Sequence, residues 1–268
     1  AFTDDDAAGA QMGVGASLAR GRVEGQQAAT AFNFAGGGVR GAQLAAGANI
    51  ATGPVFGAQL SAGVNVATKR VDGVQATAGV NLAPAGLDGA QLSAVNVAGD
   101  VIGAQVGVVN IGRRVKGLQL GVLNIAQEVD GAAIGLVTIT KDSIHPIAWA
   151  SNLAFSNAGI KFTTKYVYTL AGIGFGTRET DFDGGPVVTT ALGVHLPLFH
   201  RFDVDAEVAY TSVDLASQTN HALHPRVIAG YAFSRHFRLF AGGGPRVPVS
   251  FARGSSAVRP EVVAGVQF

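Results

Sequence analysis

The chain has 268 residues, no cysteine, 38 glycines, only 14% charged residues and a formal net charge of +1. The lack of cysteine excludes disulfide staples and thiolate metal sites, and the scattered Lys and Arg residues form no basic stripe for nucleic acid. The mean hydropathy of +0.31 is high for a water-exposed surface, yet no stretch approaches the roughly 20 consecutive apolar residues of a membrane-spanning helix.

The chain starts at Ala1 without a methionine or a charged-then-apolar leader. We therefore expect an exported protein whose secretory signal has been removed. Because the chain is apolar on average but never in a long run, we expect spanning strands that alternate lipid-facing and lumen-facing residues. The predicted location is a bacterial outer membrane, with its lipids as partners.

A repeated unit dominates residues 11–142. Copies of about 16 residues, and then of about 14 residues, begin at Val39, Val55 and Val71, and at Leu87, Val101, Val115 and Val129. Weaker copies begin at Gln11 and Val23. Inside a copy the residues alternate with period 2, which is the strand period. The alternation lasts about 10 residues, close to the length of a tilted transmembrane strand.

Charged residues of the repeats cluster at the junctions between copies, for example at Lys69, Arg70 and Asp72. A water-exposed sheet normally carries Lys and Glu on its outer face, whereas a membrane barrel confines charge to turns and lumen. Under this interpretation the polar face of the repeats lines a lumen. Its candidate residues are Gln43, Gln59, Gln75, Gln91, Gln105, Gln119, Asn49, Asn65 and Asn81.

A β-solenoid is the competing interpretation of the repeats, with identical coils that stack in parallel and Gln and Asn in ladders. A repeat of one strand, rather than one hairpin, favours it, as does the shortage of aromatic residues for a membrane girdle. The short coil and the small apolar residues argue against it. In that case a smaller barrel follows the solenoid.

Beyond the repeats, strand-length segments continue and aromatic residues appear. The predicted strands are 146–155, 159–164, 165–177, 186–196, 201–215, 224–234, 237–250 and 258–268. With the repeats, the chain adds up to one antiparallel transmembrane barrel of roughly 16 strands. We expect a single domain over 1–268, with repeat-derived strands in 11–142 and non-repeat strands in 143–268.

The segment from Arg201 alternates an apolar face with a charged, mainly acidic one that carries Arg201, Asp203, Asp205 and Glu207. Acidic groups beside lipid are prohibitive, so this face is predicted to line the lumen. By the same alternation, further charged residues point inward: Lys161, Lys165, Arg226, Arg238 or Arg246, Arg259 and Glu261. They form either a charged constriction that filters solutes or an ion-pair network that satisfies buried charge.

The last strand alternates and ends on Phe268. A C-terminal aromatic residue resembles the outer-membrane insertion signal read by the barrel assembly machinery, which is thus a predicted partner. The GxQxGxxNxA units, followed by YVYTLAGIGFG from Tyr166 and ALGVHLPLFHRFDVDAEV from Ala191, resemble bacterial surface-repeat outer-membrane proteins. The resemblance covers most of the chain and implies an outer-membrane setting, without a substrate or catalytic residues.

No motif predicts catalysis, a metal or a cofactor. His221 and His224 lie in a loop-like stretch without carboxylate or cysteine partners, and no GxSxG elbow is present. The first functional hypothesis is a passive pore for small hydrophilic solutes, and a monomer is expected because the loop candidates, 178–185 and 216–223, are short. The second is a structural or surface-display protein with a blocked barrel or a solenoid. A lipid-modifying barrel enzyme is a minor third.

Overall fold

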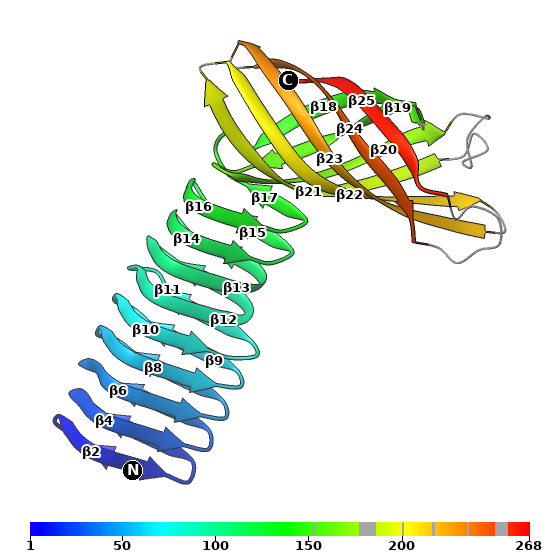
Figure 1. Ribbon diagram of the computed structural model, residues 1–268. Coiled ribbons are helices and arrows are strands. Elements are labelled where there is room, and N and C mark those ends of the chain that lie inside the picture. Colours follow the sequence, from blue (N-terminus) through cyan, green and yellow to red (C-terminus); the bar gives the residue numbers. More distant parts are fainter. Residues whose placement is uncertain (153, 177–185, 200, 216–217, 235, 250–256) are drawn as a thin grey trace. The chain divides into compact units, whose positions relative to one another are not determined.

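The structure is a computed structural model that describes residues 1–268 except 153, 177–185, 200, 216–217, 235 and 250–256. Every regular element of the described residues is a strand, which confirms the all-β class, and none of them forms a helix that would span a membrane. The chain divides into two compact units, Ala1–Lys141 and Asp142–Phe268 (Figure 1). The single domain expected over 1–268 is therefore corrected to two.

The N-terminal unit is a β-solenoid, in which the chain winds into stacked coils (Figure 1). In most coils a longer strand and a shorter strand are separated by a corner. The strands are β1 Phe2–Thr3, β2 Ala7–Gly13, β3 Ala16–Ala19, β4 Arg22–Ala29, β5 Phe32–Ala35, β6 Gly38–Ala45, β7 Ala48–Ala51, β8 Val55–Ser61, β9 Val64–Ala67, β10 Val71–Ala76, β11 Val80–Ala83, β12 Leu87–Ala98, β13 Val101–Ile111, β14 Arg114–Leu120, β15 Leu123–Ile125, β16 Glu128–Ile134 and β17 Val137–Ile139.

Neighbouring coils pair in parallel and in register. In β8 and β10, Val55 lies opposite Val71 and Gln59 lies opposite Gln75. Parallel neighbours cannot be joined by a tight hairpin turn, so the interpretation of each repeat as one antiparallel span is wrong. Each repeat is one full coil, because its alternating residues bend at a corner rather than continue straight. The barrel of roughly 16 strands is not formed, and the alternative of a solenoid followed by a smaller barrel is confirmed.

The glycine at the third position of each repeat sets the spacing of the coils. Gly57 has a φ of 132°, a conformation that residues with a side chain rarely adopt. A Cβ atom on Gly57 would lie only 2.0 Å from the carbonyl oxygen of Gly41 in the preceding coil. The repeat therefore requires glycine for close stacking of backbones and not only for a turn.

The longer and the shorter repeats differ in the number of corner residues, whereas the stacked Gln and Asn positions are the same in both. Gln75 and Asn81 of a longer coil correspond to Gln91 and Asn96 of a shorter one, so the corner between the two strands loses one residue. Gln75 still pairs with Gln91, and Asn81 still pairs with Asn96. A coil can therefore change length without moving its interior residues, because corners absorb the difference.

The C-terminal unit is a closed antiparallel barrel whose first and last strands pair with each other. Its strands are β18 Ile144–Ser151, β19 Ala154–Thr163, β20 Val167–Gly176, β21 Pro186–Phe199, β22 Phe202–Leu215, β23 Gln218–Ser234, β24 Phe237–Pro248 and β25 Arg259–Gln267. Each of the predicted strands of this half corresponds to one of them. The loop predicted over 216–223 is corrected, because β23 begins at Gln218; the other, 178–185, lies outside the described residues.

Candidate functional site

A row of acidic residues on β22 is the centre of the barrel interior. Asp203, Asp205 and Glu207 alternate with the outward-facing residues of this strand, and each is less than a tenth exposed. The alternation of a strand places them on one face, so three carboxylates lie side by side inside the barrel. Buried charges of this kind require partners of opposite sign.

Two cations from other strands pair with Asp203 and Asp205. Lys161 of β19 places its Nζ 2.6 Å from Oδ2 of Asp205. Arg238 of β24 contacts both aspartates, with its Nε 3.0 Å from Oδ1 of Asp203 and its Nη2 3.0 Å from Oδ2 of Asp205. The two carboxylates are thus shared between two fixed cations.

Glu207 begins a second group of charges further along the barrel. Arg226 of β23 donates its Nε to Glu207 Oε1 at 2.8 Å and also lies 3.5 Å from Glu261 of β25. The hydroxyl of Tyr168 donates to Glu207 at 2.5 Å. Nδ1 of His224 lies 2.7 Å from Glu261. Each acidic residue in this group therefore has at least two polar contacts.

Two glycines make room for the largest interior side chains. A Cβ atom on Gly193 would lie 2.3 Å from the ring of Tyr168, and one on Gly230 would lie 2.3 Å from the guanidinium of Arg238. These distances are far inside van der Waals contact. The ring of Tyr168 and the guanidinium of Arg238 therefore occupy space that any other residue at 193 or 230 would fill.

The described side chains leave little room for water at the middle of the barrel. The central cavity, bounded by Trp149, Tyr168, Glu207 and Arg226 among others, has a volume of about 20 Å³. A single water needs roughly 10 to 15 Å³ on this measure. Barrels of eight strands have interiors just wide enough for side chains to fill, and this one follows the rule.

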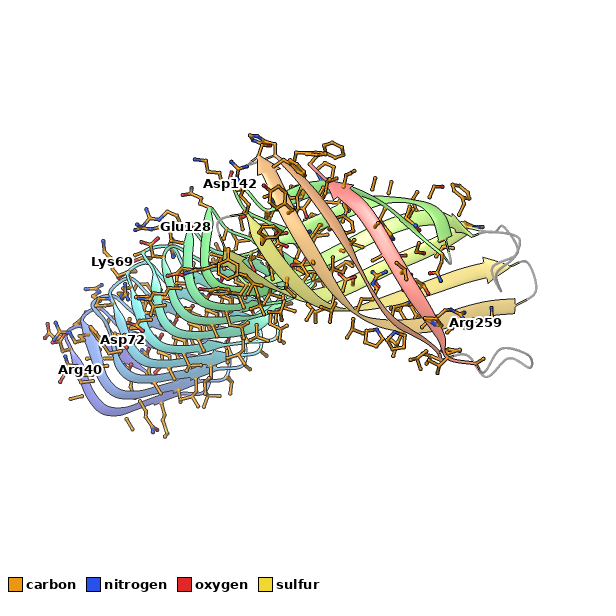
Figure 2. The ribbon with its side chains drawn as sticks, turned by 45° about the horizontal axis from the view of Figure 1, so that its top comes forward. Arg40, Lys69, Asp72, Glu128, Asp142 and Arg259 are labelled. Atoms are coloured by element: carbon orange, nitrogen blue, oxygen red, sulfur yellow. The ribbon has the colours of Figure 1, made fainter. Side chains whose placement is uncertain are left out.

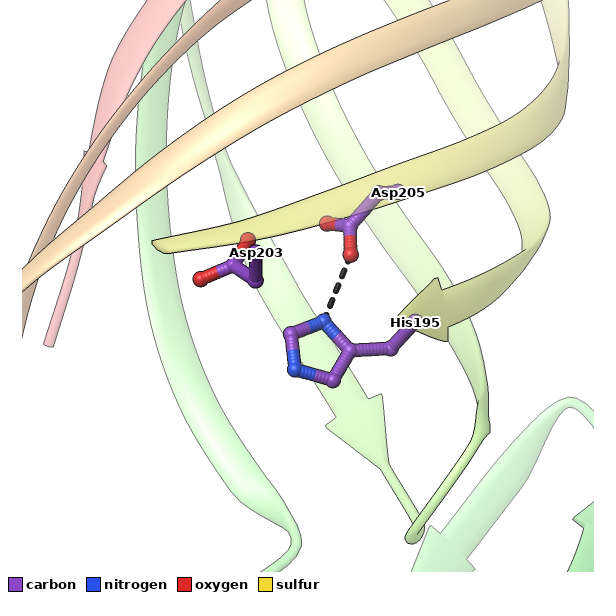
Figure 3. Close-up of side chains that lie close together, drawn as sticks. All are labelled: His195, Asp203 and Asp205. Atoms are coloured by element: carbon purple, nitrogen blue, oxygen red, sulfur yellow. Dashed lines mark hydrogen bonds and ion pairs between the residues drawn. The ribbon is translucent and has the colours of Figure 1, made fainter. Parts of the chain in front are cut away.

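A larger cavity of about 210 Å³ opens at the end of the barrel where β18 begins, and its wall includes His145, His195, His236 and Phe268. His195, Asp203 and Asp205 lie close enough here to be considered as metal ligands (Figure 3). His195 Nδ1 lies 2.6 Å from Asp205 Oδ1, yet both carboxylates already bind Lys161 or Arg238. An added metal ion would compete with these cations, so the group fits an ion-pair network better than a metal centre.

The outer surface of the barrel is the reverse of its interior. Among the described side chains of the barrel strands, charged residues stand only at inward positions of the alternation, with Arg259 exposed at the start of β25, and large apolar residues are exposed at outward positions. Examples are Ile173 at 66%, Val227 at 59% and Val262 at 63%. A surface of this kind is costly in water and is typical of contact with lipid.

An aromatic row lies on this outer surface near the short turns of the barrel. Phe202 packs on Tyr231 with ring centroids 4.8 Å apart, Tyr231 packs on Phe233 at the same distance, and Phe233, Phe237 and Phe268 continue the row at 5.9 and 5.7 Å. Aromatic residues gather where a membrane meets water. The row lies at one end of the apolar outer surface.

The Gln and Asn candidates do not line a barrel lumen, which corrects their predicted role. All are fully buried inside the solenoid. Each Gln side chain donates to the Gln of the preceding coil, as from Gln75 to Gln59 at 2.7 Å, whereas each Asn donates to the following coil, as from Asn49 to Asn65 at 2.9 Å. Two amide ladders of opposite direction therefore run through the interior. An amide suits such stacking because it carries both a donor and an acceptor.

The charged candidates divide into two groups. Lys161, Asp203, Asp205, Glu207, Arg226 and Glu261 are buried in the barrel interior, as predicted. Lys165, Arg201 and Arg259 are exposed near the ends of strands. The strand ends there bring the alternating face out into solvent, so period 2 alone does not place a residue inside.

Tyr168 and His224 are among the interior residues that were not predicted from the sequence. Tyr168 belongs to the inward face of β20 and binds Glu207, and its alternation with Val167 and Thr169 was the available signal. His224, predicted in a loop-like stretch at the start of the strand 224–234, is buried on β23 between Thr211, at 2.8 Å, and Glu261. His221 points outward and stacks on Tyr210, so the two histidines do not converge on a metal.

No protein-family model matches the chain, and no curated protein does. Among solved structures, the chain is similar to Neisserial surface protein A (NspA), at 12% sequence identity and a TM-score of 0.31. The similarity covers 47% of this chain and 93% of that chain. A similarity of this extent carries no conclusion about the function of the chain.

Proposed function

We propose that the chain is an outer-membrane protein in which a closed barrel anchors a β-solenoid. The observation that supports this most directly is the distribution of side chains in the described part of the barrel, where charged residues are buried in the interior and apolar residues are exposed on the outside. Lipid-facing charge costs about 2 to 4 kcal/mol at the midplane, so a barrel whose described side chains place no charge on the outward positions suits a bilayer. The partners that go with this proposal are outer-membrane lipids and, through the strand that ends at Phe268, the barrel assembly machinery.

A closed barrel suits an anchor better than a pore. A pore needs a continuous path of water, whereas Lys161, Asp205 and Arg226 cross the middle of the barrel in ion pairs and leave room for about one water. The charged residues then act as an ion-pair network, not as a filter for solutes.

The turns of the barrel favour a periplasmic solenoid. The chain enters β18 at the end of the barrel where all three connections are short, at 164–166, 200–201 and 235–236. The other end has two short connections, 152–153 and 216–217, and the two longest connections of the barrel, 177–185 and 249–258. Outer-membrane barrels have short periplasmic turns and longer extracellular loops. Since Lys141 directly precedes the barrel, the solenoid would be tethered on the periplasmic side.

Conductance in planar bilayers tests whether the interior of the barrel is blocked to solutes. We expect no steady conductance steps from folded full-length protein, because the described side chains at the middle of the barrel leave room for about one water. As a matched positive control, a known open porin is reconstituted in the same lipid. Steady steps from the wild-type chain would overturn the closed anchor in favour of a pore.

Labelling of cells tests the side of the solenoid. The chain has no cysteine, so single Cys variants report one site each. In a Gram-negative host, an impermeant maleimide should label Val258→Cys in intact cells and Asp72→Cys only after the outer membrane is opened. Labelling of Asp72→Cys in intact cells would place the solenoid on the cell surface instead.

A further inference from the structure

The two edges of the solenoid differ completely in charge. The charged edge joins the second strand of one coil to the first strand of the next, and it contains every charged residue of 1–141: Asp4, Asp5, Asp6, Arg20, Arg22, Glu24, Arg40, Lys69, Arg70, Asp72, Asp88, Asp100, Arg113, Arg114, Lys116, Glu128, Asp130 and Lys141. Figure 2 shows Arg40, Lys69 and Glu128 along this edge. The uncharged edge consists of the opposite corners, between the two strands of each coil.

The uncharged edge exposes aliphatic side chains. Val108 is 53% exposed, Val122 is 52% exposed and Leu136 is 55% exposed, one in each of three successive coils. Leu60 and Leu120, which are 40% and 42% exposed, occupy the same position in the first strand of their coils. The residues at this position form an apolar row that runs from coil to coil beside the uncharged edge. Apart from Ser and Thr hydroxyls, these corners offer no polar side chain, so water gains little from contact with them.

Much of the backbone of the uncharged edge is hydrogen-bonded within the solenoid. Several corner amides donate to carbonyl oxygens of the preceding coil, from Gly63 to Gly47 at 3.0 Å and from Val122 to Val108 at 2.9 Å. Hydrocarbon tolerates only backbone whose polar groups are bonded internally. The edge therefore combines two properties that favour contact with lipid, namely the lack of charged side chains and corner amides that are bonded within the solenoid, such as those of Gly63 and Val122.

The width of the solenoid matches one leaflet. From Asp72 on the charged edge to the corner at Ala78, strand geometry gives roughly 20 Å. Half of the hydrocarbon core of a bilayer is about 15 Å thick. The uncharged edge can thus lie in the hydrocarbon of one leaflet while the charges of the other edge stay in water.

We propose that the uncharged edge of the solenoid is seated in a phospholipid leaflet of the membrane that holds the barrel; this rests on the proposed function. A second protein copy is the less suitable occupant, because protein interfaces are typically enriched in aromatic residues and Arg and carry hydrogen bonds, and these corners offer neither Arg nor aromatics other than Phe32. The barrel supplies continuity, since its first strand begins within three residues of Lys141 at Ile144.

Quenching of an attached fluorophore by brominated lipid tests, in the full chain, whether the uncharged edge lies in the leaflet. Single Cys variants carry a small fluorophore, and the protein is folded into phosphatidylcholine vesicles with or without brominated acyl chains. Val122→Cys reports the uncharged edge, Lys116→Cys reports the charged edge of the same coil, and Val262→Cys reports the outer face of the barrel. We expect about a twofold or larger loss of emission at 122 and 262 in brominated lipid and little loss at 116.

The outcomes separate the two proposals. Quenching at 262 without quenching at 122 overturns the lipid seat and leaves the anchored barrel intact. Absence of quenching at both sites overturns the anchored barrel as well. If 122 is unquenched and Val122→Cys forms a disulfide between copies, the edge binds a second chain and the lipid seat is likewise overturned. Far-UV circular dichroism of each labelled variant verifies the fold, and Leu136→Cys repeats the measurement one coil further on.

Discussion

The solenoid and the barrel both bury polar side chains, but they satisfy them in opposite ways. The solenoid interior holds neutral amides in ladders, whereas the barrel interior holds acids and bases in ion pairs. Repetition explains the difference. A stacked repeat places each residue on a copy of itself, so a buried charge there would face a like charge, which is strongly unfavourable. Strands of a barrel differ from one another, so opposite charges from different strands can meet.

The largest expected effect follows from breaking the charge balance of the barrel. Asp205→Asn keeps the shape of the side chain but removes the negative charge that Lys161, His195 and Arg238 contact. Because removal of one buried partner leaves the others uncompensated, we expect a loss of about 3 to 5 kcal/mol. Urea unfolding of the barrel in lipid vesicles measures it. Arg201→Gln, at an exposed site, is the control, and equal stability of the two variants would contradict the network.

A smaller effect is expected from interrupting the neutral ladder. Gln75→Leu leaves the carbonyl oxygen of Gln59 and the amide of Gln91 without their partner. An unsatisfied buried group costs about 1 to 3 kcal/mol. Native-state hydrogen exchange of the solenoid amides is the measurement, with Asp72→Ala on the outside of the same strand as control. If protection in the two variants is the same, the ladder does not stabilise the solenoid.

Removal of an entire coil should cost less than its size implies. Deletion of 71–86 makes Gln59 the ladder neighbour of Gln91 and Asn65 the ladder neighbour of Asn96. The Gln ladder and the Asn ladder therefore both continue across the deletion. In repeat proteins each unit contacts only its neighbours, and we expect a change of about 1 kcal/mol, equivalent to about 2 to 4 °C in the melting temperature. Deletion of 71–78, which breaks the register, is the control. Equal melting of the two deletions would refute independent coils.

The smallest effect concerns a pair on the charged edge. Hydrogen bonds from Arg114 and Arg113 hold the pKa of the Asp100 carboxyl below its ordinary value of 3.8. A lowered pKa contributes stability that is present above the ordinary value and is lost as pH falls through the folded-state pKa. NMR titration of the Asp100 carboxyl should therefore show a midpoint below 3.8, which rises in the double variant Arg113→Gln, Arg114→Gln. An unchanged midpoint in that variant would disprove the assigned cause.

The sequence was sufficient for local structure and insufficient for the choice of partner strand. Period 2 identified strand-forming sequence in both halves and placed Asp203, Asp205 and Glu207 on a buried face, but it did not show the corner that divides a repeat into two strands. It did not distinguish a lumen from a solenoid interior, because Gln75 and Asn81 are polar and Val74 is apolar in either case. The discriminating signal was the glycine at position 57 and its equivalents. A positive φ stacked against a carbonyl oxygen has no use in a hairpin but is required between parallel coils.

The pairing of particular charges was beyond prediction for a different reason. Arg238 and Arg246 are both on inward positions of β24, and only the register of the closed barrel places Arg238 beside Asp203. Register depends on all the strands together. The sequence therefore predicts which side chains are inside, and the closed fold decides which of them meet.

The opposite directions of the two amide ladders have an electrical consequence. A row of amides that all donate the same way adds up to a dipole that grows with length, as it does in an α-helix. In the solenoid the Gln row donates toward the N-terminus and the Asn row donates toward the C-terminus. The side-chain dipoles therefore largely cancel, and the interior can be extended by further coils without building up a field along its axis.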